Sequence, residues 1–211
     1  MRFIENEIYH VYNRGNNHQP IFFNDDNYLH FINKIRKEWK PLCEILAWCL
    51  MPNHFHFMIS ATESSCKEIP AYGSKLIQSL ARKIGLTLSS YSHYINHQNS
   101  TSGSLFQQKT KAKCISLQEQ KSGGFLNHSL LNTTAYITTC MHYIHQNPMK
   151  AGLVKKMEDW NYSSFRDYTG LRNGTLCNKK LMLQLTGYDD TTFYNDSYNI
   201  LDDDMINGIL E

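Results

Sequence analysis

The sequence predicts an α+β protein, in which helices pack on one antiparallel β-sheet. Segments of strand length and segments of helical periodicity follow one another in the order strand, helix, strand, strand, helix, strand, helix. A short turn at residues 51–53 separates the second strand from the third, which predicts a hairpin. The hydrophobic fraction of 41% and the charged fraction of 19% are typical of a globular domain.

The first half of the chain supplies two of the strands and the first helix. Residues 8–14 are rich in β-branched and aromatic side chains and precede a glycine, which predicts a strand. Residues 24–26 can cap a helix, and the apolar residues that follow have helical spacing until Pro41. Residues 45–50 form a continuous apolar run, which indicates a strand buried on both faces.

The third strand carries a histidine pair. His54 and His56 alternate with Phe55 and Phe57 directly after the Pro-Asn turn. Because side chains on a strand alternate between its faces, the two imidazoles should project from the same face, close enough to bind one divalent ion. A half-buried strand with two incidental histidines is the alternative interpretation of this short motif.

The second half of the chain begins with a predicted amphipathic helix over residues 71–97. Lys109, Lys111 and Lys113 then alternate with smaller residues, which predicts a fourth strand with three ammonium groups on one face. Such a row either protects a solvated sheet edge or binds phosphates, and the sequence favours neither interpretation.

The last predicted helix spans residues 131–146. We expect it to end before Pro148, because a residue that precedes proline is disfavoured in the α region. Tyr136, Tyr143 and Asn147 lie near one stripe of this helix, at spacings of seven and four. Tyrosines on such a stripe more often belong to a core than to a catalytic site.

This order of elements predicts a ferredoxin-like split β-α-β sheet with an added C-terminal helix that bears Tyr143. We predict one domain over residues 1–170, followed by an acidic extension over residues 171–211. The domain has 18 basic and 12 acidic side chains, whereas the extension has 3 and 7. A basic body with an acidic tail is weak evidence for a nucleic-acid-binding protein.

Composition argues against several other classes of protein. No apolar run approaches the roughly 20 residues that a membrane-spanning helix needs. The N-terminal residues lack the apolar segment of a signal peptide. The six cysteines include no Cys-x-x-Cys pair, so a zinc ribbon or a redox motif is not indicated. We therefore expect a cytoplasmic protein with reduced thiols.

The histidine strand and the tyrosine helix together suggest phosphodiester cleavage. A tyrosine phenol can attack phosphorus and form a covalent phosphotyrosine, and Tyr143 precedes Asn147 by one helical turn. His54 and His56 could hold a divalent ion on the scissile phosphate, and Asn147 could supply a third ligand atom.

At these residues the sequence resembles the single-tyrosine HUH transposases, and in particular the REP-associated tyrosine transposases. The resemblance covers about residues 5–170 and is carried by five segments. Its most specific part is the Tyr-Ile-His-Gln-Asn-Pro block together with the aromatic segment after it. It implies a ferredoxin-like fold, Mg²⁺ or Mn²⁺ as the metal, and a single-stranded DNA substrate beside an imperfect palindromic hairpin. The matching segments are residues 11–22, 51–56, 103–107, 143–154 and 160–165.

We therefore expect a metal-dependent single-strand DNA endonuclease and strand transferase that cleaves next to a DNA hairpin. A hairpin-binding protein that does not cut, and a structural zinc domain that uses His54, His56 and Cys49, are the alternatives.

We expect a monomer or a homodimer, because a joint at residues 123–124 could let the tyrosine helix dock on its own body or on a partner's. The candidate DNA contacts are Arg14, Lys75, Arg82, Lys83, Lys109, Lys111 and Lys113.

Overall fold

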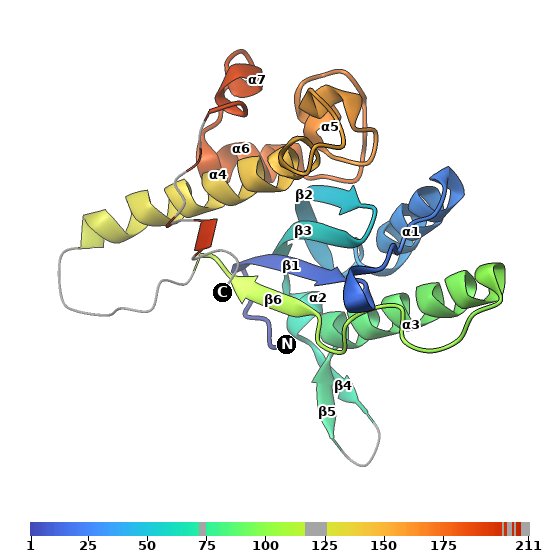
Figure 1. Ribbon diagram of the computed structural model, residues 1–211. Coiled ribbons are helices and arrows are strands. Elements are labelled where there is room, and N and C mark those ends of the chain that lie inside the picture. The colour runs from blue at the N-terminus through green and yellow to red at the C-terminus, as the bar shows by residue number, and fades with distance from the viewer. Residues whose placement is uncertain (72–74, 117–125, 200, 202–203, 205, 208–211) are drawn as a thin grey trace.

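The computed structural model describes residues 1–71, 75–116, 126–199, 201, 204 and 206–207. In this part of the chain the main sheet has four strands in the order β2-β3-β1-β6, each antiparallel to its neighbour (Figure 1). This is the strand order of a ferredoxin-like fold, so the predicted fold class is confirmed. The strands are β1 (Ile8–Arg14), β2 (Cys43–Met51), β3 (His54–Ala61) and β6 (Lys111–Cys114).

Helices cover both faces of the main sheet (Figure 1). One face packs against α1 (Asp25–Glu38) and α3 (Ser79–Asn99) in the larger hydrophobic core. The other face packs against α4 (Leu126–Lys150) and the segments that follow it, in a second core. The remaining short elements are η1 (Asn16–His18), α2 (Glu63–Cys66), β4 (Glu68–Pro70), β5 (Leu76–Gln78), η3 (Met157–Asp159), α5 (Phe165–Tyr168), α6 (Lys179–Thr186) and α7 (Phe193–Asp196).

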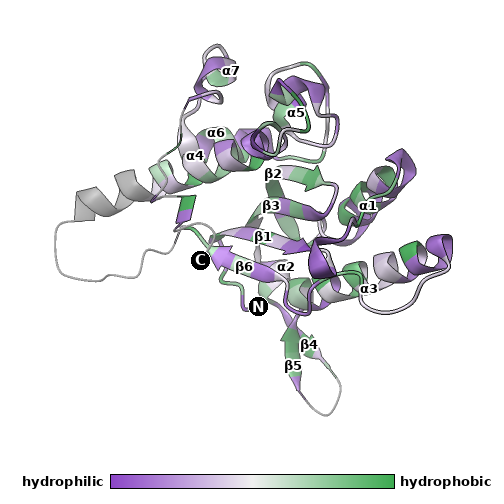
Figure 2. Cartoon of the chain, in the orientation of Figure 1, coloured by the Kyte–Doolittle hydropathy of each residue, from purple (hydrophilic) through white to green (hydrophobic). Residues whose placement is uncertain are grey.

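Local sequence signals explain most of these elements. The Asn24 side chain accepts a hydrogen bond from the Asn27 amide at 3.0 Å and caps α1, as predicted. Strand β2 is almost wholly apolar, as expected for a strand buried on both faces, and Figure 2 contrasts it with the more hydrophilic β6. The outer edge of β2 is also covered, since the Leu50 amide donates to the Tyr162 carbonyl and the Ser164 amide to the Trp48 carbonyl.

The helix predicted over residues 71–97 begins later, at Ser79. Leu76, which fits the helical spacing, instead lies in β5, where it is exposed and pairs with Pro70 of β4. Gln78 holds the segment extended, because its side-chain amide accepts a hydrogen bond from the Phe3 amide and donates one to the Phe3 carbonyl. These contacts come from the other end of the chain, so the periodicity could not reveal them.

The prediction that the tyrosine helix ends before Pro148 is wrong, because α4 continues to Lys150 and includes the proline. Pro148 has no backbone N–H, so the last turn of the helix loses only one hydrogen bond. The helix ends in a Schellman motif at Gly152, which has a φ of +70°. The Gly152 amide donates to the Met149 carbonyl, and the Leu153 amide donates to the Pro148 carbonyl, both at 3.0 Å.

Two glycines give a matched test of this helix ending. Gly152→Ala should lower the free energy of unfolding by about 1 kcal/mol, because a side chain at positive φ is strained. Gly85→Ala, inside α3, should raise it by about 0.5–1 kcal/mol, because alanine is the better helix former. A Cβ would meet no atom within 4 Å at either position, so steric clashes affect neither variant. Urea denaturation measures both changes, and equal signs would contradict the assigned helix end.

Residues 171–199, from the predicted acidic extension, pack onto the rest of the molecule. Helix α6 contacts α4 and β2, and Met182 and Phe193 are buried in the second core. Gln146 of α4 also donates to the carbonyls of Ser197 and Asn199 at 2.9 Å. The proposed joint at residues 123–124 lies outside the described residues. Among the helices that are described, none has the length and apolar character to cross a membrane.

Candidate active site

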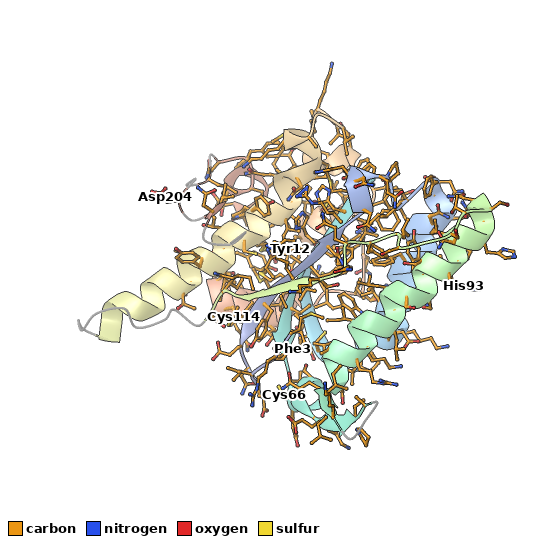
Figure 3. The ribbon with its side chains drawn as sticks, turned by 60° about the horizontal axis from the view of Figure 1, so that its bottom comes forward. Phe3, Tyr12, Cys66, His93, Cys114 and Asp204 are labelled. Carbon is orange, nitrogen blue, oxygen red and sulfur yellow. The ribbon has the colours of Figure 1, made fainter. Side chains whose placement is uncertain are left out.

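The predicted histidine face belongs to a wider polar platform on the α4 side of the sheet. The register pairs Arg14 with His54 and Tyr12 with His56 across β1 and β3. It also pairs Tyr12 with Lys111 across β1 and β6. Directly opposed residues point to the same face, so basic and aromatic side chains from three strands surround the histidines. In Figure 3 the labelled Tyr12 lies near β6, which ends at Cys114, and well away from His93 on α3.

His54 is held in one tautomer by the turn that precedes it. The Asn53 side-chain amide donates to the His18 carbonyl at 3.3 Å, so its oxygen faces His54 Nδ1 at 2.6 Å. Because that oxygen only accepts hydrogen bonds, Nδ1 carries the proton and Nε2 carries the lone pair. Burial lowers the pKa of His54 to about 4, and the nearby Asn147 side chain opposes this shift.

His56 is more deeply buried than His54 and bonds to a histidine that we did not predict. Its Nδ1 lies 2.9 Å from Nε2 of His10, in the middle of β1. Its Nε2 is buried and has no hydrogen-bond partner. Burial, together with the neighbouring imidazoles of His10 and His54, lowers the pKa of His56 well below its usual value, so the ring is neutral.

Helix α4 places Tyr143 over this histidine pair. The Tyr143 ring stands edge-on to His56, with 5.6 Å between ring centroids and an interplanar angle of 84°. Asn147 lies one turn later on α4, and its Nδ2 donates to the Tyr143 carbonyl at 2.8 Å. Burial raises the pKa of Tyr143 to about 12, and the nearby Asn147 side chain opposes this shift.

One cavity of about 540 Å³ opens onto these groups. Tyr143, His54 and His56 line it, whereas Tyr136, the nearest rival on the helix, does not. The cavity thus brings the nucleophile candidate Tyr143 together with His54 and His56, whereas the third ligand candidate, Asn147, is not part of its wall. Basic and polar side chains complete the cavity wall, among them Arg14, His18, Gln107, Lys109 and Lys111.

The predicted DNA contacts fall into two groups. Lys111 and Lys113 lie on the histidine face of β6, Lys109 precedes that strand, and Arg14 ends β1. Within the described residues none of these three lysines forms an ion pair with a carboxylate. The second group lies elsewhere, with Lys75 beside β5, Arg82 on α3, and Lys83 paired with Glu38 of α1 at 2.5 Å.

The sequence-based prediction missed His10, Tyr12 and Asn53. A signal for the first two exists, because His10 and Tyr12 are spaced by two residues on the first strand, as His54 and His56 are on the third. Only the strand register shows that both pairs occupy the same face. No pattern in the sequence indicates that the Asn53 side chain orients His54.

The donor atoms at the site could hold a divalent metal ion. Nε2 of His56 is buried without a partner, and Nε2 of His54 carries a lone pair. Both imidazoles have a hydrogen-bond partner at Nδ1, as metal-binding histidines usually do. A closed zinc site is less well supported, because the described residues contain no group of three His, Cys, Asp or Glu side chains able to hold a metal. Cys49 instead contacts the Met51 sulfur at 3.8 Å.

Fold and site together define a ferredoxin-like domain in which a tyrosine-bearing helix covers a histidine-bearing strand. A solved structure described as "Structure of the REP associates tyrosine transposase bound to a REP hairpin" has the same fold. The alignment covers 96% of this chain and 97% of that one, with a TM-score of 0.51 and 18% sequence identity. The resemblance seen in the sequence is therefore confirmed at the level of the fold. No family model and no curated protein matches the chain.

Proposed function

We propose that this protein is a metal-dependent single-strand DNA endonuclease and strand transferase, which cleaves next to a DNA hairpin and becomes covalently attached through Tyr143. One observation carries the proposal: Tyr143 comes from a part of the chain distant from His54 and His56, and all three line one basic cavity. The solved structure with the same fold is described as bound to a REP hairpin, which supports a hairpin substrate.

In the proposed reaction, the Tyr143 hydroxyl oxygen attacks the phosphorus of a phosphodiester. The new bond joins that oxygen to phosphorus, and the bond from phosphorus to the leaving deoxyribose oxygen breaks. The phenolic proton passes to the solvent, and the leaving oxygen takes up a proton, so atoms and charges balance. The phosphotyrosine conserves the energy of the cleaved bond, so a DNA hydroxyl can later reverse the attack and rejoin strands.

The residues around Tyr143 have separate roles in this proposal. Asn147 lies one helical turn after Tyr143 and would orient the phenol. His54, His56 and Asn147 would hold Mg²⁺ or Mn²⁺, which as a Lewis acid would stabilise the negative charge that develops on the phosphoryl oxygens. Arg14 and the β6 lysines would bind the flanking phosphates, which places the scissile bond near the tyrosine.

The direct test is to incubate the purified protein with Mg²⁺ and single-stranded DNA hairpins that flank its own gene. A covalent protein–DNA adduct on a denaturing gel is the expected result. If the protein binds the hairpin but forms no adduct with any of the divalent metals tested, the alternative is favoured, namely a hairpin-binding protein that does not cut.

The salt dependence of binding tests the lysines on β6 and the lysine that precedes it. Replacing Lys109, Lys111 and Lys113 with glutamine should reduce the slope of log K against log[salt] by about 2, since each phosphate contact on a single strand contributes about 0.7. A matched variant that replaces Lys75, Arg82 and Lys83 should have a smaller effect, because Lys83 already pairs with Glu38. An unchanged slope in the first variant would assign those lysines to a solvated sheet edge.

A further inference from the structure

His10 is the buried partner of the proposed metal ligand His56. It lies in the middle of β1, is fully buried, and does not line the cavity. Its ring is nearly parallel to that of His56, at an angle of 15° and a centroid distance of 5.0 Å. It also meets the Tyr143 ring edge-on, at 6.1 Å. His10 therefore contacts both a candidate ligand and the candidate nucleophile without reaching the substrate space.

The bond between the two imidazoles admits two proton arrangements. Only one hydrogen fits between His10 Nε2 and His56 Nδ1, which are 2.9 Å apart. If His56 donates, its Nε2 keeps a lone pair, and a metal ion can satisfy that atom. If His10 donates, neutral His56 must carry its proton on Nε2, which is buried without an acceptor. A buried N–H without an acceptor costs about 1–3 kcal/mol and a cation cannot relieve it, so only the first arrangement is compatible with a metal ion at His56.

We propose that His10 is a positioning residue, which accepts the hydrogen bond from His56 Nδ1 and so holds His56 in the tautomer and orientation that present its Nε2 lone pair to a divalent cation. The inference rests on the proposed function, since the cation is the one that cleavage would use. A metal-bound histidine commonly bonds through its second nitrogen, and loss of that partner typically lowers metal affinity by about 10–100-fold.

The tautomer can be measured without any metal. Long-range ¹H–¹⁵N correlation spectra of metal-free protein with ¹⁵N-labelled histidines distinguish the two neutral forms, and a His56 variant assigns its signals among the ten histidines. We expect wild-type His56 to be protonated at Nδ1, and His10→Ala to lose that preference. His10→Gln should restore it, because the glutamine oxygen can accept the same hydrogen bond. A wild-type His56 protonated at Nε2 would overturn the proposal.

Mn²⁺ titration, monitored by electron paramagnetic resonance, measures how the loss of the His10 hydrogen bond changes the affinity for the metal ion. His10→Ala should bind Mn²⁺ about 10–100-fold more weakly, and His10→Gln should recover most of the loss. His145→Ala is the matched control, because His145 is equally buried but bonds to Ser164 at 2.8 Å and lies outside the cavity wall. That variant should keep wild-type affinity for Mn²⁺ even if it is less stable.

The two experiments separate this inference from the proposed function. Wild-type affinity for Mn²⁺ in His10→Ala would overturn the positioning role, whatever the cleavage assay shows. If the tautomer and the Mn²⁺ affinity behave as expected but no hairpin yields an adduct, the proposed reaction fails and the role of His10 stands. If wild-type protein binds no Mn²⁺, both the metal site and the role of His10 toward it are refuted.

Discussion

Tyr143→Phe should fold, bind hairpin DNA with wild-type affinity, and form no covalent adduct. Phenylalanine removes only the hydroxyl oxygen and keeps the edge-on contacts of the ring with His10 and His56. Loss of a nucleophile that forms a covalent intermediate lowers the rate by several orders of magnitude, so we expect a decrease of about a thousandfold or more. Quantification of adducts on denaturing gels, alongside affinity measured by gel shift, checks both parts of the prediction.

Tyr136→Phe is the matched control for this experiment. Tyr136 lies two helical turns earlier on α4 and packs against the second core, but it does not line the cavity. Its variant should therefore cleave at the wild-type rate. Peptide mapping of the adduct gives an independent answer, because only one of the 13 tyrosines should carry the nucleotide. A nucleotide on Tyr136, or an adduct formed by Tyr143→Phe, would refute the assignment.

The sheet could be predicted from the sequence because its signals are local. Residues 8–14 form the predicted strand with the same bounds, and the apolar run at 45–50 lies inside β2. The Pro-Asn turn fixes the hairpin, which puts His54 and His56 on one face of β3. Hydrophobic periodicity and turn residues act over a few positions, and for that reason a single sequence reveals them.

The features that were missed depend on contacts between distant residues. The start of α3 depends on the two hydrogen bonds between Gln78 and Phe3, which are 75 positions apart. The end of α4 is the exception, because the motif at Gly152 is local and the prediction gave too much weight to Pro148. The bond between His10 and His56 joins residues that are 46 positions apart, and only the strand register aligns them. A sequence identifies which residues carry the chemistry more readily than which residues orient them.

Replacing both proposed histidine ligands should abolish metal-dependent cleavage while hairpin binding persists. His54→Ala and His56→Ala each remove one imidazole lone pair from the cavity, and the Lewis acid they would hold contributes several kcal/mol, so we expect rates to fall by about a hundredfold or more. Most of the affinity for DNA comes from phosphate contacts, so hairpin binding should stay within a few-fold of wild type.

The buried position of His56 calls for a second variant. The His56 side chain is only 4% exposed, so its replacement by alanine leaves a cavity that destabilises the protein. His56→Gln keeps much of the volume and supplies an amide in place of the imidazole, so a folded but cleavage-deficient His56→Gln would assign the loss to metal binding. Chelation of the wild-type protein should give the same phenotype and should be reversed by added Mn²⁺. Full cleavage by the double alanine variant would exclude His54 and His56 as the ligands and leave Tyr143 to act without them.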